Sequence, residues 1–192
     1  MKRVWVVVLI VAGLALIFGV LHRRFGNAGR LGMAEGTLAH ARSEFTFTVQ
    51  APMAEAFPLF GPVGERGWAG PHWDPQFVWP VPAKDVEGAV FRLNHNQHGG
   101  HHSATWVNTA FDAQAGHAAY AYVMDGKLAT RIDVQLSPVD AATTRVRVIY
   151  ERTALDPAVN SDVSDMALKD VKMGPEWERD IAACLKGRAP GN

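Results

Sequence analysis

The longest apolar run of the chain lies near its beginning. Val4 to Leu21 contains eighteen residues without a charge. A helix of about 20 apolar residues spans the hydrocarbon core of a bilayer. The run is longer than the apolar part of a typical secretory signal peptide, and it ends at His22-Arg23-Arg24 instead of a small-residue cleavage site. We therefore expect a transmembrane anchor over residues 1–21, with a cleaved signal peptide as the alternative.

Basic residues flank both ends of this run. Lys2 and Arg3 precede it and three arginines follow it, so the positive-inside rule does not fix the orientation of the anchor. Residues 22–42 contain several glycines and no strong hydrophobic period. We expect them to form a flexible tether between the membrane and a soluble domain over residues 43–192, with the side of the membrane left open.

Short segments of the soluble part alternate polar and apolar positions. Glu44 to Val49 shows this alternation, and Pro52 then suits the first turn of a short helix over Met53–Phe60. Asp125-Gly126 is typical of a two-residue hairpin turn. One apolar face and one polar face for each strand is the pattern of an antiparallel sheet with one solvated side. Five further segments have the pattern of strands: Ala89–Asn94, Ala104–Phe111, Ala118–Met124, Ala129–Leu136 and Thr144–Thr153.

The hydrophobic period changes toward the C-terminus. Apolar residues from Val163 to Leu185 recur at helical spacing, and Asn160-Ser161-Asp162 offers side-chain oxygens for an N-cap. Gly174-Pro175 interrupts this pattern, because proline lacks the amide donor and clashes with the preceding turn. We expect a kinked helix, or two helices that meet there. A strand, a short helix, a run of antiparallel strands and a long terminal helix together indicate an α+β domain.

Several local motifs accompany this order of elements. They are "VQAPMAEAFPLF" (Val49–Phe60), Trp68, "VEGAVFRL" (Val86–Leu93), "TWVNTAFD" (Thr105–Asp112), "TTRVRVIYERTAL" (Thr143–Leu155), and Trp177 with Ile181. From Phe45 to Leu185 the chain thereby resembles the START-like superfamily, also called SRPBCC, which includes polyketide cyclases and lipid-transfer proteins. The resemblance implies a helix-grip fold, in which a curved antiparallel sheet wraps a long C-terminal helix and leaves a cavity for a hydrophobic ligand. Pro58 and Gly174-Pro175 depart from that pattern.

A hydrophobic small molecule, lipid-like or aromatic, is therefore the expected partner, with no cofactor. A curved sheet on one helix does not easily fill its concave side with side chains, and ligand sites are mostly apolar with a few polar groups. The alternative for each aromatic residue is an ordinary place in the core. The candidate ligand-binding residues are eight aromatic residues and one histidine: Trp68, Trp73, Phe91, His95, Trp106, Tyr120, Tyr122, Tyr150 and Trp177.

The distribution of charge argues against nucleic acid as a partner. Residues 1–42 carry six basic and one acidic side chain, and the remainder carries 13 basic and 18 acidic ones. Phosphate binding needs a basic face, which an acidic main domain does not supply. Cys184 is the only cysteine, so an internal disulfide is excluded.

Histidines cluster in the segment "HNQHGGHHS", which begins at His95. With Gly99-Gly100 as a two-residue hairpin turn, His98 faces His101 and His95 faces Ala104. The four histidines then divide equally between the two faces of the sheet, whereas a zinc site normally needs at least three protein ligands. We therefore predict no metal site, and a metal-handling protein built on His95–His102 stays as an alternative.

Catalysis has little support in the sequence. The chain has no phosphate-binding glycine-rich loop, no G-x-S-x-G and no H-E-x-x-H motif, so we assign no catalytic residue. The enzyme alternative is a cyclase- or dehydratase-like reaction on a hydrophobic substrate. It would use His95, or His72 with Asp74, for proton transfer.

Overall fold

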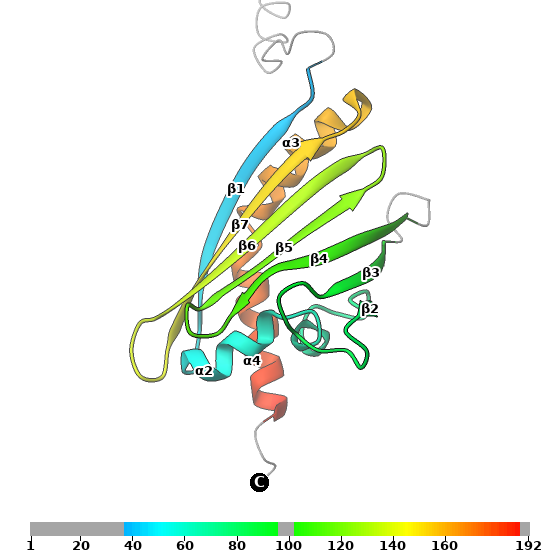
Figure 1. Cartoon of the computed structure of the whole chain (residues 1–192). Coiled ribbons are helices and arrows are strands. Elements are labelled where there is room, and N and C mark those ends of the chain that lie inside the picture. Colours follow the sequence, from blue (N-terminus) through cyan, green and yellow to red (C-terminus); the bar gives the residue numbers. More distant parts are fainter. Residues whose placement is uncertain (1–36, 96–101, 189–192) are drawn as a thin grey trace, which may run out of the picture. The chain divides into compact units, whose positions relative to one another are not determined.

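Seven antiparallel strands form one curved sheet in the order β1-β7-β6-β5-β4-β3-β2 (Figure 1). The structure is a computed structural model and describes residues 37–95 and 102–188. The strands are β1 (His40–Val49), β2 (Gln76–Trp79), β3 (Val90–His95), β4 (His102–Asp112), β5 (His117–Met124), β6 (Leu128–Pro138) and β7 (Thr144–Ala154). Strands β2 to β7 are therefore neighbours in chain order, and β1 closes the sheet beside β7.

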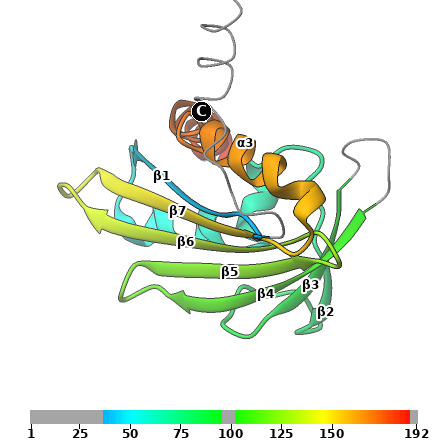
Figure 2. The ribbon, with the colours of Figure 1, turned by 90° about the horizontal axis from the view of Figure 1, so that it is seen from above.

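The helices lie on the concave side of this sheet (Figure 2). Three short helices follow β1: α2 (Met53–Ala56), η1 (Phe57–Phe60) and η2 (Gly64–Gly67). A fourth short helix, η3 (Pro157–Val159), precedes the terminal pair of helices. The terminal pair is α3 (Asn160–Asp170) and α4 (Gly174–Arg188), both of which contact β1. The hydrophobic core lies between them and the sheet, where β1 contributes Phe45, Phe47 and Val49 and α4 contributes Ile181.

The alternation of hydrophobic and polar residues predicted most of the strands, because the hydrophobic positions are the ones that the folded sheet buries. In β1, Phe45 and Phe47 are buried whereas Glu44 and Thr46 are exposed. The predicted strands from Ala89 to Thr153 coincide with β3 to β7 within one or two residues at most ends. Two details differ. Strand β1 already begins at His40, inside the predicted tether, because its first residues pair with β7. These residues show no apolar alternation, so the sequence did not predict them as part of the strand. Strand β2 was not predicted, because most of its side chains are exposed.

The turn between β5 and β6 is longer than predicted. Met124 pairs with Leu128, so three residues form the loop instead of two. The Lys127 amide donates to the Met124 carbonyl over 2.9 Å, and Gly126 has a φ of 63°. A glycine in the left-handed region is the usual solution for three-residue hairpin loops, so the predicted turn residue is right and the loop length is wrong.

The terminal helix is divided at the predicted position. Helix α3 ends at Asp170 and α4 begins at Gly174, where a side-chain β-carbon would lie 3.2 Å from the Thr46 carbonyl oxygen. Glycine therefore lets α4 begin close against β1. The predicted N-cap is wrong: Asn160 is already helical, and its side-chain oxygen accepts a hydrogen bond from the Ala39 amide over 2.7 Å.

The predicted anchor, Val4–Leu21, lies outside the described residues. Within residues 37–95 and 102–188, no helix is long and apolar enough to cross a bilayer. From Leu38 onward the chain forms one compact unit, which begins slightly before the predicted domain boundary at Ser43.

Candidate functional site

The predicted ligand-binding residues mostly lie on the concave face and form two clusters of rings. In the first, the Trp106 ring stacks on Tyr122 at 4.1 Å between centroids and meets Trp73 edge-on at 5.6 Å. In the second, the Trp177 ring lies 4.9 Å from Trp68. Phe91 joins the first cluster, Tyr150 joins the second through Phe45, and Tyr120 contacts Trp106. The side chain of His95 lies outside the described part of the structure.

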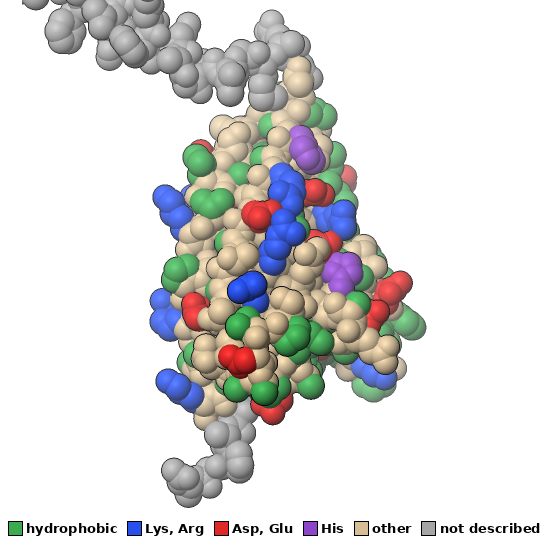
Figure 3. Space-filling model, turned by 90° about the vertical axis from the view of Figure 1, so that its left-hand side faces the viewer, with side chains coloured by type: hydrophobic (Ala, Val, Ile, Leu, Met, Phe, Trp, Pro, Cys, Tyr) green, Lys and Arg blue, Asp and Glu red, His purple; other side chains and the backbone are tan. Residues whose placement is uncertain are grey.

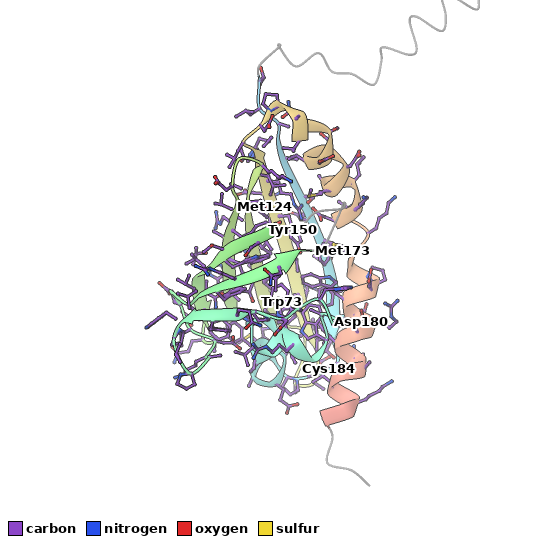
Figure 4. All side chains as sticks on the ribbon, turned by 90° about the vertical axis from the view of Figure 1, so that its right-hand side faces the viewer. Trp73, Met124, Tyr150, Met173, Asp180 and Cys184 are labelled. Carbon is purple, nitrogen blue, oxygen red and sulfur yellow. The ribbon has the colours of Figure 1, made fainter. Side chains whose placement is uncertain are left out.

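Most of these rings form core, and a few stay partly exposed. Trp68, Phe91, Trp106, Tyr120 and Tyr150 are buried, as the alternative for individual aromatic residues expected. Trp177 is partly exposed, and so are other hydrophobic side chains packed against the core, among them Trp73, Tyr122, Met124 and Met173. We call these four the aromatic rim; Figure 4 labels Trp73, Met124 and Met173 with Tyr150 between the strands and the helices.

A buried acid lies behind the first cluster. The Tyr120 hydroxyl donates to Glu65 Oε1 over 2.9 Å and also contacts the Phe60 carbonyl oxygen. Burial raises the pKa of Glu65 to about 8, against the opposing effect of the hydrogen bond from Tyr120. Glu65 is therefore mostly protonated at neutral pH. No pattern in the surrounding sequence distinguishes it from a solvent-exposed glutamate.

A buried ion pair connects the sheet to α3 at the other end of the concave face. The Arg152 guanidinium donates through both terminal nitrogens to the Asp170 carboxylate, which also accepts from the Ser43 hydroxyl over 2.6 Å. Arg152 Cζ lies 4.3 Å from the Tyr150 ring centroid. Sequence reasoning missed this network, although the alternation of β7 does place Arg152 on the same face as Tyr150.

The outer face of the sheet carries a network of opposite charges instead. Asp133 accepts hydrogen bonds from His117 over 3.2 Å and from Arg131 over 2.8 Å. These donors, with Gln135, hold the pKa of Asp133 below its usual value, although its partial burial opposes the shift. A hollow of about 150 Å³ beside them is lined by Arg42, Arg131, Asp133, Gln135, Ile149 and Glu151. Figure 3 shows basic and acidic side chains interspersed on one side of the domain, so this surface has no single sign of charge.

A second, more open hollow lies between η2 and α4. It measures about 590 Å³ and is lined by Gly67, Trp68, Asp180, Ala183, Cys184 and Gly187. Figure 4 labels Asp180 and Cys184 on this part of α4. We call this hollow the α4 groove. Cys184, the only cysteine of the chain, lines it, so the reactivity of its thiol can reveal a ligand bound there.

The predicted acid–base pair does not form. His72 and Asp74 are both exposed, and the Asp74 carboxylate accepts a hydrogen bond from the Gln76 side chain over 2.8 Å. This local hydrogen bond is typical of a turn, as expected for a residue that precedes Pro75.

The histidine segment pairs in a different register from the predicted one. His95 lies opposite His102 and not opposite Ala104, so six residues separate the paired strand ends. A shift of two residues keeps the same strand positions on the same face of the sheet, because faces alternate with a period of two. The predicted turn at Gly99-Gly100 lies outside the described residues. Among those that are described, no three His, Cys, Asp or Glu side chains are grouped to hold a metal ion.

A curved antiparallel sheet with a long, divided C-terminal helix on its concave face is the helix-grip fold. Solved structures of other proteins have the same fold. The Zhui aromatase/cyclase from Streptomyces sp. R1128 has a TM-score of 0.60 and 14% identity, over 79% of this chain and 97% of that one. Norcoclaurine synthase from Thalictrum flavum, in complex with dopamine and hydroxybenzaldehyde, has a TM-score of 0.57 and 8% identity, over 85% and 100%.

A third similar structure is an uncharacterised protein from Rhizobium leguminosarum, with a TM-score of 0.56 and 15% identity over 79% of this chain and 98% of that one. These TM-scores show a common fold, which is the fold that the START-like resemblance implied. No family model and no curated protein sequence matches the chain.

Proposed function

We propose that the domain binds a hydrophobic small molecule on its concave face, against the aromatic rim. The observation that carries this proposal is the partial exposure of Trp73, Tyr122, Met124 and Met173 beside the buried rings of the hydrophobic core. Aromatic rings offer large apolar area, and methionine adapts its shape to different partners. Two proteins with the same fold support it, because their names refer to an aromatase/cyclase and to a complex with two aromatic molecules.

A charge placed on the aromatic rim is expected to weaken ligand binding. Met124→Lys introduces an ammonium group that an apolar ligand would have to desolvate, and we expect at least about a tenfold loss of affinity. The matched control is Val123→Lys, since Val123 is 50% exposed on the opposite face of the same strand. The measurement is the fluorescence of N-phenyl-1-naphthylamine with the full chain in lipid nanodiscs, corrected by empty discs.

Two results would contradict this proposal. Equal affinity in Met124→Lys and Val123→Lys would remove the aromatic rim as the site. Protection of Cys184 from a thiol reagent by the bound probe would place the ligand in the α4 groove instead, because Cys184 lines that groove.

We also propose that Val4–Leu21 anchors the domain in a membrane, on the strength of its eighteen uncharged residues. The full chain is expected to stay in the membrane fraction through high-salt and carbonate washing, because insertion of such a helix is effectively irreversible. A variant without residues 1–36 serves as the control and is expected in the supernatant. Recovery of a soluble mature protein that begins near residue 27 would show a cleaved signal peptide.

A further inference from the structure

A strip of polar side chains continues the aromatic rim across the concave face. The strand register places Tyr122 opposite Thr130 and Thr130 opposite Arg152. Directly opposite residues have their β-carbons about 4.5–5.5 Å apart, so the three side chains are immediate neighbours. Thr130 is only 3% exposed and Arg152 only 7% exposed. The strip therefore runs from a partly exposed tyrosine into the interior of the domain.

Two buried polar atoms of this strip have no hydrogen-bond partner among the described residues. They are Thr130 Oγ1 and Arg152 Nε. Both terminal nitrogens of Arg152 already donate to Asp170, and Nε is the guanidinium nitrogen without a hydrogen-bond partner. A buried polar atom without a partner is costly, and proteins keep few of them. Two such atoms on directly paired residues indicate a place where an oxygen atom from outside the chain is bound.

The chemistry of the strip selects a neutral oxygen. Arg152 already has its charge balanced by the Asp170 carboxylate, so a second carboxylate would be repelled. A hydroxyl or carbonyl oxygen accepts a hydrogen bond from Arg152 Nε without that penalty. The Thr130 hydroxyl acts as donor or acceptor toward the same group. The rest of the molecule would then extend over the partly exposed Tyr122 ring and the Met124 side chain.

We propose that Thr130 and Arg152 bind a hydroxyl or carbonyl oxygen of a mostly apolar ligand whose hydrophobic part lies on the aromatic rim. This inference rests on the proposed function and specifies its ligand: a neutral, singly oxygenated hydrophobic compound, such as a phenol, an alcohol or a ketone, and not a fatty acid anion or a pure hydrocarbon.

Thr130→Val tests this inference, because valine keeps the shape of threonine and removes the hydroxyl. The probes are 2-naphthol and naphthalene, which differ by one hydroxyl group. Binding is followed by tryptophan fluorescence of the full chain in nanodiscs, at free probe concentrations corrected with empty discs. We expect the ratio of the two dissociation constants to shift about fivefold or more against 2-naphthol in Thr130→Val, with naphthalene binding unchanged. Thr46→Val, at an exposed position of β1, is the control and leaves the ratio unchanged.

The possible outcomes distinguish this inference from the proposed function on which it rests. An unchanged ratio in Thr130→Val overturns the oxygen site while leaving a hydrophobic ligand on the aromatic rim. A parallel loss of both probes in Thr130→Val also overturns it, because the threonine would then act through packing alone. Failure of the wild-type chain to bind either probe overturns both the oxygen site and the proposed function.

Discussion

Asp170→Ala is expected to lower the free energy of unfolding by about 3–5 kcal/mol, because it leaves the buried guanidinium of Arg152 without a counter-charge. The same substitution removes the acceptor of the Ser43 hydroxyl. The loss is therefore larger than for a surface ion pair, which contributes about 0–1 kcal/mol. Denaturant unfolding followed by tryptophan fluorescence measures it directly.

Asp165→Ala is the matched control for this prediction, since Asp165 is an exposed residue of the same helix. It is expected to change stability by no more than about 0.5 kcal/mol. The double substitution Arg152→Met with Asp170→Leu is expected to regain much of the loss, because well-packed apolar side chains often replace a buried ion pair without cost. Equal stabilities of Asp170→Ala and Asp165→Ala would show that the ion pair does not hold α3 to the sheet.

Glu65→Gln is expected to remove most of a strong pH dependence of stability. Burial raises the pKa of Glu65 in the folded chain from 4.5 to about 8. Between these values the folded state holds a proton that the unfolded state has released, so stability falls as the pH rises, by about 1.4 kcal/mol for each pH unit. Its contribution is complete below pH 4.5 and is lost as the pH passes 8. Glutamine stays neutral and still accepts the hydrogen bond from Tyr120, so the variant is expected to be the more stable protein at pH 8.

The measurement is denaturant unfolding at several pH values between 5 and 9 for the wild-type chain and two variants. Glu55→Gln is the control, because Glu55 is an exposed residue of α2. Its stability curve is expected to run parallel to that of the wild-type chain. A Glu65→Gln curve with the wild-type slope would mean that Glu65 is ionised in the folded domain.

The strands and the divided helix follow from local sequence, whereas the polar contacts do not. Alternation places Phe45 and Tyr150 on one face because a sheet with a single buried side requires it. The break at Gly174 follows from the proline beside it. Strand β2 is held by pairing with β3 at the edge of the sheet and buries little of its own, so no apolar pattern marks it.

Of the candidate site, only the aromatic residues were predicted from the sequence. The aromatic residues are recognisable by type, and the structure gathers most of them on the concave face. That Trp73 and Tyr122 stay partly exposed while Phe91 is fully buried depends on how far the helices cover the sheet, which no local pattern encodes. Arg152 follows the inward alternation of β7, but its partner Asp170 lies on a helix whose position only the folded domain defines. Thr130 is noticeable only because its hydroxyl lacks a partner.

The close approach of α4 to β1 at Gly174 has a consequence for self-association. An edge strand with unpaired backbone groups is a template on which another chain can add a strand. Helices α3 and α4 contact β1 along one border of the sheet, and at the other border β2 is four residues long and lies between Pro75 and Pro80. Both borders are therefore poor templates for fibre growth or domain swapping.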